Sequence, residues 1–205
     1  MIMNKRKPLL LIVSSPSGAG KTTLCHRLLA EFSDVRFSIS HTTRPPRPNE
    51  VDGQDYHFVE EGVFDQMVDD ELFIEWAHVH GNRYGTAHAE IRSASLDGCD
   101  LIFDVDYQGA KQIKGQYPEA IGVFVLPPSI EELKRRLSSR GTETPESLDR
   151  RFKAALNEIE HHDEFDYLLV NDVIEEAYDR LRAVLLSERI RRPRIDHMAK
   201  RLLDS

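Results

Sequence analysis

The segment SPSGAGKT contains the residue types that bind a phosphate chain. Gly18 and Gly20 allow neighbouring backbone N–H groups to converge on an anion. Lys21 adds a full positive charge, and Thr22 adds a hydroxyl suited to the coordination shell of Mg²⁺. Ser15 stands where the pattern G-x-x-x-x-G-K-[ST] has its first glycine. Because serine is small, we expect a phosphate-binding loop whose entry is slightly altered.

The elements on either side of this loop support that interpretation. The apolar run Leu9–Val13 predicts a buried strand, and Lys21–Phe32 predicts a helix with a leucine stripe on one face. The pattern requires a strand before the loop and a helix after it, and the helix N-terminus adds a partial positive charge. The alternatives are a plain strand–helix turn with a solvated lysine, and a secretion signal in which a charged start precedes the apolar run.

Further apolar strands are predicted downstream, alternating with helices. The strands are Leu101–Asp106, Ile121–Leu126 and Tyr167–Val170, and the helices are Ser129–Ser139, Glu146–His161 and Glu175–Arg192, the last ended by Pro193. Continuous apolar strands that alternate with helices are typical of a parallel sheet covered on both faces. The sequence therefore predicts an α/β fold.

Residues 37–87 have a different character, because their predicted elements are short and more polar. These elements are the strands Phe37–Ser40, Tyr56–Val59 and Phe73–Val79 and the helix Gly62–Asp70. A proline-rich stretch between the first two strands excludes a helix there. Residues 129–163 contain no predicted strand and many charges. We predict a single domain, 1–205, with a core of about 1–36, 88–128 and 164–205, an insert of about 37–87 and a helical lid of about 129–163.

Six segments occur in this order: SSPSGAGKTTL, SHTTRPPRPNEVDGQDYHF, IEWAHVHGNRYGT, DVDYQG, RRLSSRGTETPESLDRRF and VND. Together they resemble the bacterial guanylate kinase family from about Leu9 to Arg192. The resemblance implies a P-loop kinase core with a parallel sheet flanked by helices, an inserted GMP-binding subdomain and a helical lid. It also implies transfer of the γ-phosphoryl group of ATP to GMP, giving ADP and GDP. Two other classes remain open: a kinase for another nucleotide or a sugar phosphate, and a guanylate-kinase-like scaffold domain that binds partner peptides without catalysis.

The resemblance implies that the loop and the lid hold ATP. Arg136 and Arg140 lie four residues apart on one helical face, and with Arg151 they match lid arginines that pack on adenine and hold the phosphates. Asn171 can donate and accept hydrogen bonds, which suits the adenine edge. The residues predicted to bind ATP are Ser15, Pro16, Ser17, Gly18, Ala19, Gly20, Lys21, Thr22, Thr23, Arg136 and Asn171. The residues predicted to act in catalysis are Lys21, Arg44, Arg140 and Arg151.

The acceptor site is predicted in the insert and at the end of a core strand. Arg44 and Arg47 lie on a loop stiffened by prolines, and guanidinium groups suit a phosphate monoester. A carboxylate at Glu75 would accept from guanine N1–H and N2–H and so select guanine over adenine. The resemblance implies that Asp106 helps to read the same groups. The other residues predicted to bind GMP are Ser40 and Thr86, as donors to guanine O6, and Tyr56 and Tyr84, as hydroxyl donors.

Asp104 and Asp106 lie two residues apart at the end of a predicted strand, so we expect them to point the same way. Open parallel sheets bind ligands at this edge. Asp104 is predicted to hold Mg²⁺ through water, together with Thr22. Which carboxylate serves the metal and which serves guanine stays open. The nine histidines show no metal-binding framework, so we do not expect them to bind a metal.

The formal net charge of −8 argues against general adhesion to nucleic acid or to an anionic membrane. No apolar run approaches the roughly 20 residues of a membrane span. Cys25 and Cys99 show no metal-binding spacing and are interpreted as reduced thiols of a cytoplasmic protein. A homo-oligomer is compatible with the sequence, and so is dGMP as a second acceptor. The basic segment Ser187–Arg194 is interpreted as a solvated or oligomer-contact tail.

Overall fold

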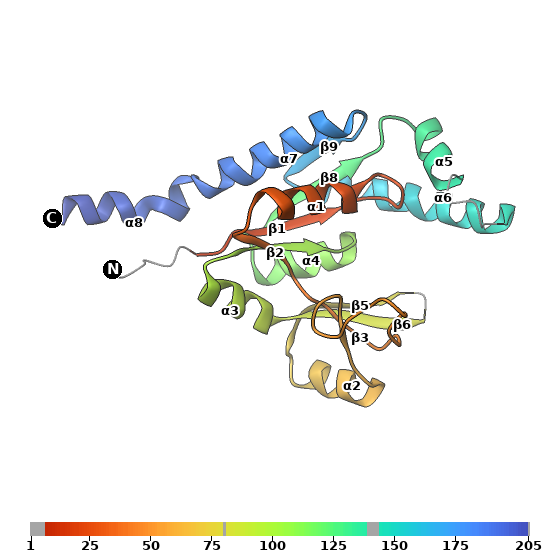
Figure 1. Cartoon of the computed structure of the whole chain (residues 1–205), viewed down its shortest axis with the longest axis horizontal. Coiled ribbons are helices and arrows are strands. Elements are labelled where there is room, and N and C mark those ends of the chain that lie inside the picture. Colours follow the sequence, from red (N-terminus) through yellow and green to blue (C-terminus); the bar gives the residue numbers. More distant parts are fainter. Residues whose placement is uncertain (1–6, 80, 139–143, 205) are drawn as a thin grey trace.

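The computed structural model describes residues 7–79, 81–138 and 144–204, and its core is a five-stranded sheet (Figure 1). The strands, in spatial order, are β2 (Val35–Phe37), β7 (Asp100–Asp104), β1 (Leu10–Ser14), β8 (Ile121–Leu126) and β9 (Tyr167–Val170). Every neighbouring pair is parallel. Strand β1 is central and fully buried, which explains its nearly continuous apolar sequence. The predicted α/β fold class is confirmed.

Helices cover both faces of this sheet (Figure 1). Helices α1 (Lys21–Glu31) and α7 (Ile174–Arg189) pack on one face, and α3 (His88–Asp97) and α4 (Tyr107–Gln116) pack on the other. The odd-numbered apolar residues of β1 belong to the first core, and the even-numbered ones belong to the second. This alternation follows from the two-residue side-chain period of a strand.

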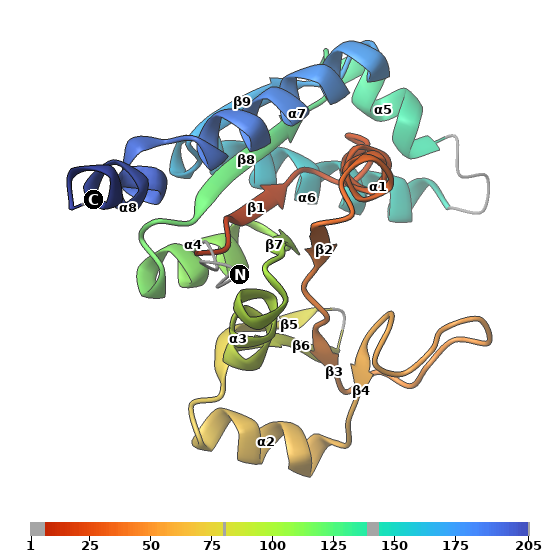
Figure 2. The same ribbon diagram turned by 60° about the vertical axis from the view of Figure 1, so that its left-hand side comes forward.

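A second sheet of four strands lies beside the core, below it in Figure 2. Its strands, in spatial order, are β4 (His57–Phe58), β3 (His41–Thr42), β6 (Asn82–Ala87) and β5 (Phe73–Val79), and helix α2 (Glu61–Asp69) follows β4. Phe64 of α2 packs against Phe73 with ring centroids 4.5 Å apart. Trp76 is half-buried against the same small cluster.

Side chains of α4 bind the second sheet directly to the core. Gln112 accepts from the backbone N–H of Trp76 through Oε1 and donates to its carbonyl through Nε2, both at 3.1 Å. Gln116 Nε2 donates to the carbonyl of Ile74 at 2.9 Å. These amides satisfy backbone groups of β5 that the sheet leaves unpaired. Strand β5 is therefore hydrogen bonded on one side to β6 and on the other to a core helix.

Helices α5 (Ile130–Ser138) and α6 (Pro145–Glu160) pack together around a small core of their own. Its buried members are Leu133, Leu137 and Ala155. A short 3₁₀ turn, His162–Glu164, then leads into β9. In Figure 2 this helix pair lies at the far side of the core from α2 and its sheet.

The C-terminal region differs from its prediction. Helix α7 ends at Arg189, and Pro193 lies in the first turn of a further helix, α8 (Arg192–Leu203), where proline is tolerated. Arg189 donates to Asp34 at 2.8 Å and to the buried Asp100 at 2.7 Å. Arg189 is therefore an anchor inside the fold, which corrects its interpretation as part of a tail, whereas Arg191 and Arg192 are exposed.

Two other predictions need correction. The strand expected at Phe37–Ser40 ends at Phe37, and Ser38–Ser40 connect β2 to β3. Helices α3 and α4 were not predicted, and β7 ends at Asp104 rather than Asp106. In the part of the chain that the structure describes, no helix is long and apolar enough to cross a membrane.

Candidate active site

The loop after β1 has the backbone shape of a phosphate-binding loop. Gly18 has φ +89° and Gly20 has φ +95°, both in the left-handed region that favours glycine. A Cβ at Gly20 would overlap Nδ2 of Asn171, so glycine is required there for space as well as for conformation. Helix α1 begins directly afterwards, at Lys21. Its unpaired N–H groups and its dipole therefore face the loop.

Asn171 holds the phosphate-binding loop through a side-chain hydrogen bond. The residue is buried, and its Nδ2 donates to the carbonyl of Ala19 at 2.7 Å. Arg136 in turn donates to the carbonyl of Asn171 at 3.0 Å and to Glu132 at 2.6 Å. The contact predicted between Asn171 and adenine stays a prediction, and the structure gives this residue a second task that the sequence did not indicate.

Ser15 fits the loop without strain. The only non-glycine residue with a positive φ among those described is Glu71, so the backbone at Ser15 needs no glycine. The Ser15 hydroxyl donates to the carbonyl of Pro16 at 3.1 Å. Ser15 thus adds a local side-chain hydrogen bond at a position where the backbone does not require glycine.

Replacing Ser15 with glycine is expected to change the affinity for MgATP by less than about fivefold, because the added backbone entropy is worth at most about 1 kcal/mol. Gly20→Ala is the matched contrast and should abolish binding, since the new methyl group overlaps Asn171. Titration calorimetry with MgATP measures both variants. A collapse of binding in Ser15→Gly would assign the hydroxyl a role of its own.

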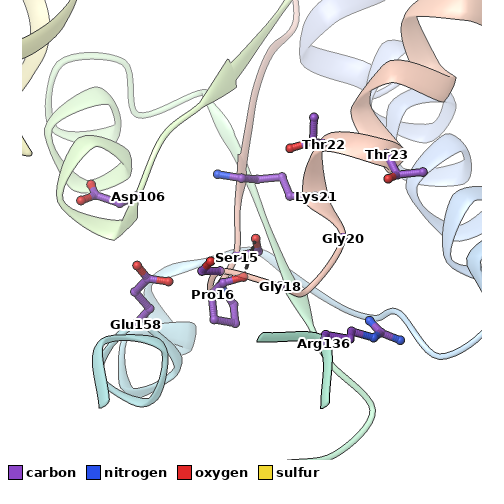
Figure 3. A pocket seen from close by; sticks show the side chains of 11 residues that line it. Ser15, Pro16, Gly18, Gly20, Lys21, Thr22, Thr23, Asp106, Arg136 and Glu158 are labelled. Atoms are coloured by element: carbon purple, nitrogen blue, oxygen red, sulfur yellow. Dashed lines mark hydrogen bonds between the residues drawn. The ribbon is translucent and has the colours of Figure 1, made fainter. Parts of the chain in front are cut away.

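Lys21 points from the start of α1 into a cavity of about 480 Å³ (Figure 3). Its Nζ lies 2.5 Å from Asp104 Oδ1 and 3.4 Å from the carbonyl of Val105. The cavity is lined by the loop from Ser15 to Thr23 except Ala19, and by Asp106, Arg136 and Glu158. A second cavity, of about 390 Å³, shares Lys21, Asp106 and Glu158 with the first. These three residues mark the boundary where the two cavities meet.

Glu75 lines the second cavity. It sits in β5 just after an irregularity in the pairing with β6, and only 6% of its surface is exposed. Thr86 donates to its Oε1 at 2.6 Å, and Ser40 Oγ lies 3.0 Å from Thr86 Oγ1. Burial raises the pKa of Glu75 to about 7, with a further contribution from the negative charge of Asp106, while Thr86 opposes the rise. The structure thus brings four of the predicted guanine-binding residues together.

The prediction that Asp106 lies on the same strand as Asp104 was wrong, because the strand ends at Asp104. Asp106 caps the N-terminus of α4 and accepts from the backbone N–H of Gly109 through Oδ1 at 2.9 Å. Gly109 also allows α4 to approach the second cavity, because a Cβ there would lie 3.2 Å from Glu75 Oε2. Asp104 therefore pairs with Lys21, whereas Asp106 caps a helix. Strand periodicity could not predict this difference, because the strand ends between the two residues.

Arg44 lies at the other end of the second sheet, where three predicted residues gather. Its Nε donates to Tyr84 Oη at 3.2 Å, and its guanidinium lies 5.4 Å from the ring centroid of Tyr56. Glu50 holds the guanidinium through two hydrogen bonds of 2.9 Å. These bonds hold the pKa of Glu50 below its usual value. Glu50 was missed by the sequence reasoning, since nothing in a polar loop distinguishes it.

Three further arginines were predicted to bind a substrate or to act in catalysis. Arg151 of α6 donates to the hydroxyl of Ser17 at 2.8 Å, so it reaches the phosphate-binding loop. Arg47 is exposed, and its backbone N–H donates to Glu50. Arg140 lies outside the described residues, and its predicted role stays a prediction.

Comparison with known proteins agrees with the resemblance noted in the sequence. The family profile described as guanylate kinase matches residues 5–188. The guanylate kinase of Dechloromonas aromatica is 52% identical over 176 residues, covering 86% of this chain and 87% of that protein. That of Syntrophotalea carbinolica is 48% identical over 200 residues, covering 98% and 95%.

Solved structures give the same result at the level of the fold. The crystal structure of guanylate kinase from Anaplasma phagocytophilum superposes with a TM-score of 0.73 at 32% identity, covering 93% of this chain and 90% of that one. The SH3-kinase fragment of tight junction protein 3 superposes with a TM-score of 0.51 at 13% identity, covering 91% of this chain and 59% of that fragment. The second likeness concerns the fold alone.

Proposed function

Because the chain belongs to the guanylate kinase family, it transfers the γ-phosphoryl group of ATP to GMP, and we propose that its two adjoining cavities divide this task. The cavity lined by the loop takes the phosphates of ATP, and the cavity lined by Glu75 takes GMP. The observation that carries the assignment is the shared boundary of Lys21, Asp106 and Glu158. It is where donor and acceptor phosphates would meet.

On the ATP side, the loop N–H groups, the α1 dipole and Lys21 hold the phosphates. Arg151 already contacts the loop and is placed to neutralise charge that grows on the transferring group. We assign Arg136 and Arg140 to the nucleotide from the family resemblance. Residues 129–163 would then act as the lid that excludes water, which competes with GMP as an acceptor.

On the GMP side, an ionised Glu75 accepts from guanine N1–H and N2–H. Thr86 and Ser40 lie beside it, and Thr86 now directs its hydroxyl hydrogen to Glu75, so it must turn to donate to guanine O6. Arg44 with Tyr56 and Tyr84 binds the phosphate, for which Glu50 currently substitutes as the anionic partner. We assign Arg47 to the same phosphate, and residues 37–87 to the GMP-binding insert.

The residues near Lys21 fit Mg²⁺. Thr22 and Asp104 line one cavity together and offer only oxygen ligands, which this ion prefers. No group of three or more His, Cys, Asp or Glu side chains within residues 7–79, 81–138 and 144–204 is arranged to hold a metal. Magnesium would therefore rely mainly on phosphate oxygens and water, with Thr22 and Asp104 as its protein contacts. When bound, it neutralises phosphate charge.

The chemical step needs no strong base on the protein, because the phosphate of GMP is already an anionic nucleophile. The residues act by holding the two phosphates in line and by balancing negative charge. Lys21 spans the boundary between the cavities and so can follow the phosphoryl group as it moves. We propose that this reaction takes place in the cytoplasm, in agreement with the unpaired Cys25 and Cys99.

An assay of ADP release with GMP, dGMP, AMP, CMP and UMP as acceptors tests the proposal. We expect strong preference for guanine, and the dGMP arm shows whether the ribose 2′-hydroxyl is read. A preference for another base would support a different nucleotide kinase. No turnover with any acceptor, in a folded protein that binds GMP, would support the scaffold-type alternative.

The preference for GMP over AMP is expected to rise with pH and to level off above about pH 7. Protonated Glu75 cannot accept from both guanine donors, and its pKa of about 7 places the change there. The measurement is the ratio of kcat/KM for GMP to kcat/KM for AMP. Both acceptors carry the same phosphate group, so its titration affects both values equally and cancels in the ratio. A flat ratio from pH 6 to pH 8.5 would contradict the role of the Glu75 charge.

A further inference from the structure

Glu90 is a buried carboxylate at the place where the second sheet joins the core. The chain crosses between the two parts twice, through residues 38–40 from β2 to β3 and through the junction of β6 with α3 (Figure 2). Glu90 lies in the first turn of α3, and only 9% of its surface is exposed. The helix dipole favours a carboxylate there, but burial of the charge requires partners.

The partners of Glu90 come from the other crossing. The backbone N–H of Ile39 donates to its Oε2 at 3.0 Å, and Arg36 of β2 donates to the same oxygen through Nη1 at 3.1 Å. Nη2 of Arg36 donates to the backbone carbonyl of Glu90 at 3.3 Å. One residue of α3 therefore ties the two crossings to each other.

Ile39 needs this acceptor because the pairing of β3 with β6 stops before it. The last pair toward the core joins His41 to Gly85, and Ile39 lies two residues beyond this pair. Its N–H donates to a side chain where a continued ladder would offer a backbone carbonyl. Glu90 thus holds the two segments together past the end of the strand pairing.

Ser40 and Thr86 lie next to this tie, one on each crossing. Ser40 follows Ile39 directly, and Thr86 lies just before the start of α3. Their hydroxyl oxygens are 3.0 Å apart. The N–H of His57 donates to the carbonyl of Ser40 at 2.9 Å. The position of Ser40 is therefore set on one side by the second sheet and on the other by Glu90, through Ile39.

We propose that Glu90 is a positioning residue for recognition of guanine. By binding Ile39, it holds Ser40 and Thr86 close together, so that both hydroxyls reach the same atom, guanine O6. The inference rests on the proposed assignment of these two hydroxyls to O6. Glu90 lines neither of the two cavities and acts through the backbone. The tie to Ile39 requires an acceptor oxygen at the position of Oε2, and an amide oxygen can fill it.

The test compares Glu90→Gln, Glu90→Asp and Glu90→Ala by kcat/KM for GMP at saturating MgATP. Glutamine keeps an acceptor oxygen at the same reach, whereas aspartate keeps the charge on a shorter side chain. We expect kcat/KM to fall by less than about threefold in Glu90→Gln and by about tenfold in the other two variants. The reverse order, with Glu90→Asp closer to the wild type, would assign the effect to the ion pair with Arg36 and overturn the proposal.

An analogue of the base separates positioning from general support of the fold. 6-Thio-GMP keeps the N1–H and N2–H donors of guanine but carries sulfur, a weaker acceptor, in place of O6. The preference of the wild type for GMP over 6-thio-GMP should shrink at least about threefold in Glu90→Asp, because displaced hydroxyls no longer read this atom. The KM for MgATP should stay within about twofold. An unchanged preference in folded Glu90→Asp would overturn the proposal.

Asp97→Ala is the matched control, because Asp97 is an exposed carboxylate on the same helix. It should leave kcat/KM for GMP and the preference over 6-thio-GMP unchanged. Thermal unfolding is recorded for every variant, and if Glu90→Ala does not fold, Glu90→Gln and Glu90→Asp carry the comparison. Wild-type protein that selects GMP over AMP but does not distinguish 6-thio-GMP would also overturn the proposal. Wild-type protein without preference for GMP over AMP would instead refute the proposed function.

Discussion

Lys21→Ala is expected to lower kcat by at least about 10²- to 10³-fold, because loss of one group that stabilises transition-state charge has effects of this size. Lys21 is the cation at the boundary of the two cavities, so no other described residue takes its place between the phosphates without moving. The variant should remain folded, since among the described residues the Lys21 ammonium group has its polar contacts with Asp104 and with the carbonyl of Val105, at the rim of the sheet.

The measurement is kcat at saturating MgATP and GMP, with thermal unfolding recorded in parallel. Lys111→Ala is the control, because Lys111 is an exposed lysine on α4 and its removal changes the net charge equally. Near-normal kcat in folded Lys21→Ala would remove this residue from the mechanism.

Glu75→Gln is expected to lower kcat/KM for GMP by about thirty- to a thousand-fold, which corresponds to roughly 2–4 kcal/mol for a lost charge-assisted pair and poorly met donors. Glutamine keeps the size of the side chain but offers one acceptor oxygen and an NH₂ group that opposes a guanine donor. AMP should lose less, because adenine presents an acceptor at N1 that the carboxylate repels.

The stability of the same variant distinguishes recognition from support of the fold. The pKa of Glu75 rises from 4.5 to about 7 on folding, so the folded state holds its proton more tightly and stability falls as pH rises through this range. The penalty approaches about 3 kcal/mol above pH 7. Glu75→Gln should therefore be at least as stable as the wild type at pH 8.

Glu60→Gln, an exposed change in the same part of the chain, is the control for Glu75→Gln. Equal losses for GMP and AMP, or a fall in stability at pH 8, would show that Glu75 supports the fold or the phosphate. The base would then be read elsewhere, with Asp106 as the next candidate.

The fold could be predicted wherever local sequence and tertiary environment agree. The β1–loop–α1 unit combines an apolar run, two glycines and a leucine stripe, and each of these acts within a few residues. Helix α4 was missed because it carries Gly109 and Gly115, which oppose a helix in isolation. Gly109 is needed for the close approach to Glu75, and packing on the sheet stabilises the helix in spite of it.

Among the residues of the candidate site, too, those with a local signal in the sequence could be predicted and the others could not. Glu75 could be singled out because a carboxylate among apolar neighbours is unusual. Glu50 could not, since it lies in a polar loop and its role depends on the hydrogen bonds that it forms with Arg44 in the folded chain. Asp106 was placed on a strand because the polypeptide was assumed to continue straight, whereas it turns there to begin a helix.

The hydrogen bonds from α4 to β5 hold the backbone on both sides of the residue proposed to read the base. Glu75 lies between Ile74 and Trp76, and Gln116 and Gln112 hold the backbone of both neighbours. Its carboxylate is therefore preorganised and need not lose conformational entropy when a base arrives. A base that lacks the two guanine donors therefore meets a carboxylate that needs no prior rearrangement to discriminate against it.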